Sequence, residues 1–312
     1  MKYTANSDTS LEESIFQILY EVRKIDMGKK RCKIHIEKQK GEKIMLNKKV
    51  TFIGGGNMAE GIIRGMIQEG ACAKENIEVF DVVERRLDYL KETYGVAVAS
   101  EAGEAIKNSQ ILFIAVRPQD AKGVLEQIKN NKSSNDLIIS ICAGVTLEQM
   151  SDILGESARI ARVMPNVLIE AKHGYSGICT STQVTKEDKE DMETMFAALG
   201  QTIFIQENQF DAFTAFSCAG PAYIMHCIEG MIDAGVRSGF SRFDSRNMVL
   251  ENFIGSGILL QKTNIHPFEQ VDRMTSPAGV TIEGVSVLNE EGLTGILMKA
   301  VKAAMDRTKE LS

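Results

Sequence analysis

A glycine-rich segment at residues 52–59 restricts the fold of this chain more than any other part of the sequence. It reads Phe-Ile-Gly-Gly-Gly-Asn-Met-Ala, lies at the end of a β-branched and aromatic run, and opens a stretch with helical periodicity. In the pattern G-x-G-x-x-G/A, Gly54 forms the tight turn, Gly56 lets the backbone approach a pyrophosphate, and Ala59 allows close helix–strand packing. Free N–H groups at the helix start bind the phosphates. The segment therefore predicts a dinucleotide-binding site formed by Gly54, Gly56, Asn57 and Met58.

Short apolar runs alternate with helical stretches from residue 49 onward, which predicts a parallel sheet covered by helices. We expect strands at residues 50–54, 77–81, 96–98, 111–116, 137–141, 158–164, 175–180 and 202–205, with helices at 57–69, 84–94 and 186–199. After about residue 208 only helical periodicity remains. The predicted fold class is therefore α/β: an N-terminal Rossmann-type doubly wound sheet at residues 49–207, followed by an all-α C-terminal domain at residues 208–312.

Asp81 ends the second predicted strand, where an acid binds the ribose hydroxyls of the cofactor. A carboxylate there favours a free 2′-hydroxyl and repels a 2′-phosphate. Arg85 and Arg86 follow one turn later and are alternative ligands for that phosphate, although both also suit a solvated helix face. We therefore expect NADPH or NADH as cofactor, with a slight preference for NADH that rests on Asp81.

The N-terminal segment at residues 1–48 differs from the rest, because it holds eleven Lys and Arg against seven Asp and Glu. It has no core-building pattern beyond one amphipathic stretch, which predicts a disordered or loosely helical extension. A sharper hypothesis is a mis-assigned start. Lys40-Gly41-Glu42 can be encoded by a purine-rich ribosome-binding site, so that translation begins at Met45 and residues 1–44 are not translated.

Overall charge and composition exclude several classes of function. The net charge of −6 argues against a nucleic-acid partner. The longest apolar runs are far shorter than the roughly 20 residues of a membrane span, and residues 1–20 lack the apolar core of a signal peptide. Six cysteines without C-x-x-C indicate reduced thiols in a cytoplasmic protein. No motif indicates a metal site, and His226 and His266 are interpreted as packing or capping residues.

Four parts of the chain together resemble the pyrroline-5-carboxylate reductase family: residues 52–59, 115–118, 162–166, and the C-terminal pair 220–223 and 275–281. The family reduces the C=N bond of 1-pyrroline-5-carboxylate to give L-proline with NADPH or NADH. Its helical domain dimerises by interlocking, and many members form rings of dimers. The resemblance therefore implies a homodimer or larger ring. It also implies that Val116, Arg117 and Pro118 border the cofactor and that Ala143 lies near the nicotinamide.

Small residues in the C-terminal helices bear on the same question of assembly. They are Gly230, Gly235, Gly255 and Gly257. Because they allow helices to approach closely, they suit an intertwined dimer and packing within one subunit equally well.

The candidate substrate site begins at Ser276-Pro277, which is typical of a helix start with Ser276 as N-cap and Pro277 in the first helical position. The N–H groups of Ala278, Gly279 and Val280 would then be unpaired and suited to a substrate carboxylate, although a capped helix without ligand is the alternative.

The resemblance implies substrate contacts for Pro165 and Asn166 and catalytic roles for Ser276 and Thr281. Thr281 would bond the imine nitrogen. A cyclic imine can enter already protonated, so no strong general acid is required.

The sequence departs from the family pattern near this inferred site. Cys218 and Ala219 replace a glycine or serine, Val167 and Leu168 replace Thr-Pro, and Arg117 stands where lysine is frequent. Ala278 replaces a glycine, which we expect to be harmless if the residue is helical. Three functions remain open: a pyrroline-5-carboxylate reductase, a sister reductase of another cyclic imine or small acid, and a cofactor-binding paralogue that has lost catalysis.

Overall fold

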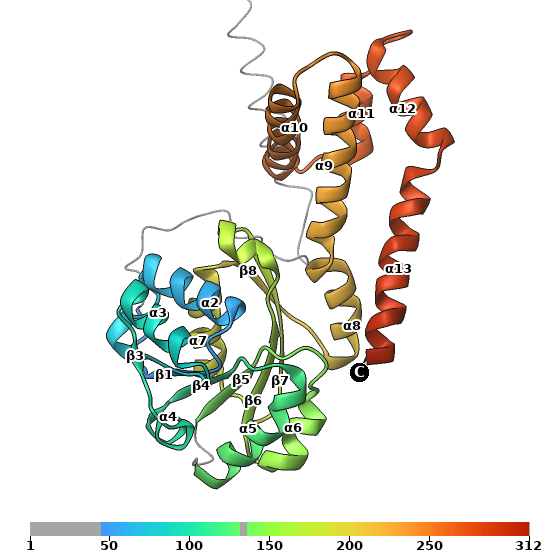
Figure 1. Ribbon diagram of the computed structural model, residues 1–312. Coiled ribbons are helices and arrows are strands. Elements are labelled where there is room, and N and C mark those ends of the chain that lie inside the picture. The colour runs from blue at the N-terminus through green and yellow to red at the C-terminus, as the bar shows by residue number, and fades with distance from the viewer. Residues whose placement is uncertain (1–44, 132–135, 312) are drawn as a thin grey trace, which may run out of the picture. The chain divides into compact units, whose positions relative to one another are not determined.

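The computed structural model describes residues 45–131 and 136–311 (Figure 1). The expected N-terminal extension comprises residues 1–48, of which residues 1–44 lie outside the described residues. Residues 45–48 are described, and within them Leu46 is buried and forms a parallel β-bridge with Cys72.

An eight-stranded sheet forms the first part of the described chain, with the strand order β3-β2-β1-β4-β5-β6-β7-β8. The strands are β1 (Val50–Ile53), β2 (Ile77–Phe80), β3 (Ala97–Val98), β4 (Ile111–Ile114), β5 (Leu137–Ser140), β6 (Arg159–Met164), β7 (Gly174–Thr180) and β8 (Gly200–Phe204). The order 3-2-1-4-5-6 is that of doubly wound dinucleotide-binding folds. All neighbours are parallel except β6 and β7, which run antiparallel. The predicted strands are confirmed to within a few residues at their ends, but their sequences did not indicate this reversal.

Helices cover both faces of the sheet (Figure 1). One face carries α2 (Asn57–Gln68), α3 (Glu84–Tyr94) and α7 (Lys186–Ala197), and the other carries α4 (Ala102–Asn108), α5 (Pro118–Asn131) and α6 (Leu147–Leu154). Every residue of β1, β4 and β5 is buried, because each central strand packs against helices on both sides. Phe52 stacks on Phe113 with ring centroids 4.4 Å apart. The core therefore lies in two layers, one on each face.

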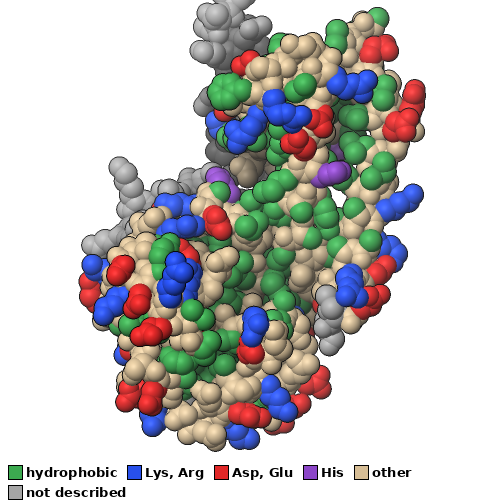
Figure 2. All heavy atoms as spheres, viewed as in Figure 1, with side chains coloured by type: hydrophobic (Ala, Val, Ile, Leu, Met, Phe, Trp, Pro, Cys, Tyr) green, Lys and Arg blue, Asp and Glu red, His purple; other side chains and the backbone are tan. Residues whose placement is uncertain are grey.

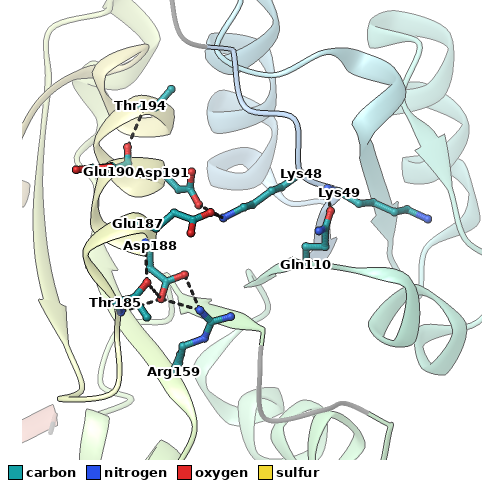
Figure 3. A network of polar contacts seen from close by, with 10 residues as sticks. All are labelled: Lys48, Lys49, Gln110, Arg159, Thr185, Glu187, Asp188, Glu190, Asp191 and Thr194. Carbon is teal, nitrogen blue, oxygen red and sulfur yellow. Dashed lines mark hydrogen bonds and ion pairs between the residues drawn. The ribbon is translucent and has the colours of Figure 1, made fainter.

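A polar network ties α7 to the amino ends of the strands (Figure 3). Lys48, just before β1, bonds Glu187 and Asp191 at 2.6 Å each. Arg159, at the start of β6, donates both of its bonds to Asp188 at 3.1 Å, and Asp188 is buried. Since the glycine turn follows the carboxyl end of β1, this network lies at the opposite edge of the sheet and stabilises the fold.

Helices make up the rest of the described chain. They are α8 (Phe210–Phe213), a π-helix at Thr214–Cys218, α9 (Gly220–Arg237), α10 (Arg242–Thr263), α11 (Pro267–Met274), α12 (Val280–Glu290) and α13 (Leu293–Leu311). Within residues 205–311 there is no strand, so the predicted all-α C-terminal part is confirmed. His266 caps α11 by accepting the Phe268 N–H on Nδ1 at 3.3 Å, which confirms the capping interpretation of this residue.

These C-terminal helices lack a substantial core of their own. Neither α11 nor α12 contains a buried residue. Large apolar side chains are exposed instead: Phe216 at 70%, Phe243 at 72% and Met298 at 69%. Figure 2 shows hydrophobic side chains on the visible surface of α9 and α13. An apolar surface of this kind is typical of a contact with another protein chain. None of the helices in the described ranges combines the length and apolar character that crossing a membrane requires.

Candidate functional site

The glycine turn has the backbone shape that its pattern predicts. Gly54 has a φ of +103°, and a Cβ on it would lie 2.5 Å from the Ala115 carbonyl oxygen, so only glycine fits. Gly56 is the N-cap of α2 with a φ of −65°, and no atom beyond its chain neighbours lies within 4 Å of the position its Cβ would take. Asn57 and Met58 begin the helix, and Ala59 is buried against the core. The chain therefore leaves β1 in a conformation that only glycine can adopt, and the space at the N-terminus of α2 is open. This combination fits a pyrophosphate.

A cavity of about 270 Å³ lies beside this turn at the carboxyl ends of β1, β2 and β4. Four predicted cofactor residues line it: Gly54, Asp81, Val116 and Arg117. A further cavity of about 570 Å³ extends from Asp81 along α3. Val82 lines both cavities and is 89% exposed, but no motif marks this residue in the sequence. Pro118 begins α5, and Ala143 lies exposed in the turn after β5.

Asp81 and Arg86 both bind the glycine turn. The Asp81 carboxylate accepts the Gly55 N–H at 2.7 Å on Oδ2 and the Val83 N–H at 2.9 Å on Oδ1. Each carboxylate oxygen can accept more than one hydrogen bond, so capacity for a ribose hydroxyl remains. Arg86 donates from Nε to the Gly55 carbonyl oxygen and pairs with Glu60. Of the two arginines considered for a 2′-phosphate, Arg86 is therefore already engaged within the protein, whereas Arg85 is exposed.

The predicted helix start at Ser276-Pro277 is wrong. Helix α12 begins at Val280, its N-cap is Gly279, and no side chain caps it. Residues 276–279 form a turn closed by a hydrogen bond from the Gly279 N–H to the Ser276 carbonyl oxygen at 2.9 Å. Ala278 has a φ of +56°, so it is not helical and its replacement of glycine is not harmless. A proline followed by a residue with positive φ is typical of a type II turn. Ser-Pro occurs at such turns as well as at helix starts, and this explains the wrong prediction.

The correction moves the available donors along the chain. Because the Gly279 N–H is used within the turn, the N–H groups at the first positions of α12 are those of Val280 and Thr281. Val280 is 93% exposed, and both Ser276 and Thr281 are exposed as well. Within the part of the chain that the structure describes, the Thr281 side chain forms no hydrogen bond, so its hydroxyl is available to a ligand.

Replacing Ala278 by glycine should stabilise the protein. A left-handed conformation costs a non-glycine residue about 1–2 kcal/mol, and the greater chain entropy of glycine offsets about half of that gain. We expect Ala278→Gly to raise the free energy of unfolding by about 0.5–1 kcal/mol in urea titrations. Ala303→Gly, at an exposed helical position in α13, is the control and should lower it by about 1 kcal/mol. Destabilisation by both changes would contradict the strained turn.

Asn166 and Pro165 are buried after β6. The Asn166 side chain accepts the Leu168 N–H at 3.2 Å and the Tyr175 N–H at 3.3 Å, and it donates to the Ser217 carbonyl oxygen at 3.1 Å. Its amide is therefore engaged with the backbone. These bonds join the 162–166 motif to the π-helix that carries Cys218, two segments that are distant in the sequence.

Two of the departures from the family pattern, Cys218 and Ala219, lie at the end of that π-helix, and two others, Val167 and Leu168, follow Asn166. Burial raises the pKa of the Cys218 thiol to about 12, so this side chain is neutral at physiological pH. Its Sγ lies 3.8 Å from the Pro165 carbonyl oxygen, and Ala219 follows it directly. Val167 is 48% exposed, while Leu168 is half-buried.

The predicted residues thus form three groups in the described chain. The first is the cofactor edge around Gly54 and Asp81, the second is the Asn166–Cys218 junction, and the third is the turn at residues 276–281. Among the described residues, no hydrogen bond joins the third group to either of the others. Of the five cysteines that the structure describes, Cys72, Cys142 and Cys179 are buried and none forms a disulfide.

Comparison with known proteins places both parts of the chain. Residues 207–311 match a family described as pyrroline-5-carboxylate reductase dimerisation, and residues 49–144 match one described as NADP oxidoreductase, coenzyme F420-dependent. The chain is 38% identical over 267 residues to a pyrroline-5-carboxylate reductase of Methanosarcina acetivorans, a match that covers 86% of this chain and 99% of that protein. It is 34% identical over 268 residues to the Aquifex aeolicus pyrroline-5-carboxylate reductase, covering 86% and 99%.

Solved structures show the same likeness. A pyrroline-5-carboxylate reductase from Coxiella burnetii superposes with a TM-score of 0.80 at 31% identity, covering 85% of this chain and 98% of that chain. The Plasmodium falciparum pyrroline carboxylate reductase, solved with NADP bound, superposes with a TM-score of 0.77 at 31% identity, covering 86% and 99%.

Proposed function

Because this chain belongs to the pyrroline-5-carboxylate reductase family, we propose that it transfers a hydride from NADH or NADPH to the C=N bond of 1-pyrroline-5-carboxylate, forming L-proline. The observation that carries this proposal is the glycine turn, where Gly54 admits no side chain and the space beside Gly56 is open. That turn opens onto the cavity at the carboxyl ends of the parallel strands, where ligands of such sheets bind.

The cofactor, when bound, supplies the hydride. Backbone N–H groups at Gly56, Asn57 and Met58 bind its pyrophosphate at the helix N-terminus. Asp81 accepts hydrogen bonds from the ribose hydroxyls. Val116, Arg117 and Pro118 border the cofactor after β4, and Ala143 lies by the reactive ring. These residues bind and orient, and the orientation brings the donor and acceptor carbons into line.

The substrate carboxylate binds the first N–H groups of α12, at Val280 and Thr281. The helix dipole contributes about 0.3–1 kcal/mol, whereas each hydrogen bond to a charged group contributes about 1.5–3 kcal/mol, so the hydrogen bonds determine the orientation. The Thr281 hydroxyl oxygen accepts the N–H of the protonated imine and holds it in register. Ser276 supports the turn from which α12 starts. Proton transfer from a strong acid is not required, because the imine enters protonated.

The proposal includes a homodimer or a ring of dimers in the cytoplasm. The exposed apolar side chains of the C-terminal helices support it, since Phe243 and Met298 would become buried in a contact with another chain. The turn at residues 276–281 then meets a cofactor edge, either within one subunit or across the dimer.

We propose a preference for NADH over NADPH. A 2′-phosphate brings about two negative charges close to Asp81, and Glu84 and Asp88 line the same cavity. Of the two arginines considered for that phosphate, Arg86 is paired with Glu60, and only the exposed Arg85 remains. The Plasmodium falciparum relative was solved with NADP bound. The preference for NADH is therefore argued from the residues of this chain alone and not from that relative.

The oxidation of NADH and of NADPH, each with 1-pyrroline-5-carboxylate and with its six-membered analogue, tests the proposal. We expect the highest kcat/KM for NADH with the five-membered imine. A higher value for the six-membered ring would favour the sister reductase, for which the changes at Cys218 and Ala219 provide a reason. Cofactor binding without turnover of either imine would favour the paralogue that has lost catalysis.

A further inference from the structure

Four side chains of α2 and α3 that lie outside the motif form a cluster, and one of them, Arg86, binds the glycine turn. The Glu60 carboxylate pairs with Arg86, and its Oε1 accepts hydrogen bonds from the Tyr94 hydroxyl at 2.7 Å and from the Tyr89 hydroxyl at 3.1 Å. The guanidinium carbon of Arg86 also lies 5.1 Å from the centroid of the Tyr89 ring. Arg86 and Glu60 are only 23% and 17% exposed, so the pair is shielded from solvent far more than an ordinary surface ion pair.

Hydrogen bonds engage both carboxylate oxygens of Glu60 and two of the three guanidinium nitrogens of Arg86. Burial alone would raise the pKa of the Glu60 carboxyl, but the hydrogen bonds from Tyr94 and Arg86 hold it below its usual value. Glu60 is therefore charged at neutral pH and fixes the guanidinium in place. Arg86 donates its Nε–H to the Gly55 carbonyl oxygen.

The bond to Gly55 determines the direction of the next N–H group. The Gly55 carbonyl and the Gly56 N–H belong to one planar trans peptide, in which the two groups point in opposite directions. When Arg86 holds the carbonyl, the Gly56 N–H is turned to the other side. On the preceding peptide, Asp81 accepts the Gly55 N–H at 2.7 Å. Both peptides that flank Gly55 are thus fixed by side chains before any cofactor binds.

We infer that Arg86, held by Glu60 and Tyr94, is a positioning residue that orients the Gly56 N–H and so pre-forms the pyrophosphate-binding turn. The inference rests on the nicotinamide cofactor of the proposed function. It assigns to Arg86 a role in binding either cofactor, in place of selective contact with a 2′-phosphate. A turn that is already ordered loses less conformational freedom on binding, which is the source of the gain in affinity.

Isothermal titration of NADH into the full chain tests the inference without turnover. We expect Arg86→Met to raise the Kd for NADH about tenfold, the scale of one hydrogen bond from a charged donor. The KM for 1-pyrroline-5-carboxylate at saturating NADH should stay unchanged, because the turn does not contact that substrate. Arg85→Met is the matched control, since it removes the same charge from the neighbouring exposed residue, and its Kd should change less than about twofold.

Glu60→Ala distinguishes positioning from simple charge attraction. Removing a carboxylate near an anionic ligand should tighten binding if only charge matters. If Glu60 holds Arg86 in place, the same change should raise the Kd for NADH by about three- to fivefold. Tighter binding by Glu60→Ala, equal weakening by Arg86→Met and Arg85→Met, or an unchanged Kd for Arg86→Met would each overturn the inference.

A second variant and the behaviour of the wild-type protein separate the positioning role from protein folding and from the proposed function. If Arg86→Met does not fold, Tyr94→Phe removes only the hydroxyl bonded to Glu60, and an unchanged Kd for that variant would overturn the inference. Wild-type protein that binds NADH but turns over no imine would contradict the proposed function and leave the positioning role standing. Normal turnover with unaltered NADH binding by Arg86→Met would remove the positioning role alone.

Discussion

Gly54→Ala is expected to lower the free energy of unfolding by about 3 kcal/mol or more and to abolish cofactor binding. The added methyl would lie 2.5 Å from the Ala115 carbonyl oxygen and 2.7 Å from its carbon, both in the backbone that leaves β4. Backbone beside a central strand cannot move without breaking the sheet. A φ of +103° is also unfavourable for alanine. Chemical denaturation followed by circular dichroism measures the loss.

Gly56→Ala is the control for this result, since it adds the same methyl two residues later. No atom beyond the chain neighbours lies within 4 Å of that position, and a φ of −65° is allowed for alanine. We expect the stability to fall by less than about 1 kcal/mol, the cost of alanine at an N-cap. The Kd for NADH should nevertheless rise at least about tenfold, because the methyl fills the space through which the pyrophosphate approaches. Equal destabilisation by both changes would contradict this division of roles between the two glycines.

Thr281→Val is expected to lower kcat/KM for 1-pyrroline-5-carboxylate by about 10–100-fold, the equivalent of one charge-assisted hydrogen bond to the imine nitrogen. Valine matches threonine in shape, and residue 281 is the second residue of α12 and is exposed. The helix should therefore persist. The Kd for NADH should not change. Steady-state kinetics together with NADH titration separate the two effects.

Thr281→Ser provides the matching control, because it retains the hydroxyl and removes only a methyl group. Its kcat/KM should stay within about threefold of the wild-type value. If Thr281→Val turned over the imine as fast as the wild-type protein, Thr281 would not belong to the substrate site.

Secondary structure was largely predictable from local patterns. Continuous apolar runs at β4 and β5 indicated strands buried on both faces, and the structure confirms both. The wrong prediction of a helix start at Ser276-Pro277 also has a local cause. Proline followed by a small residue is compatible with both a helix start and a type II turn. The hydrogen bond from the Gly279 N–H to the Ser276 carbonyl oxygen shows that a turn forms here.

By itself, the sequence determined the order of the strands and helices, the glycine turn after β1, and the family to which the chain is similar. Those features depend on neighbouring residues, whose periodicity and steric limits are visible along the chain. Only the tertiary structure decided that β7 runs antiparallel to β6, that Asn166 bonds the Ser217 carbonyl, and that Arg86 pairs with Glu60. Each of these contacts joins residues at least 13 positions apart in sequence. These pairings therefore depend on how the whole sheet packs with its helices, and local sequence patterns do not predict that packing.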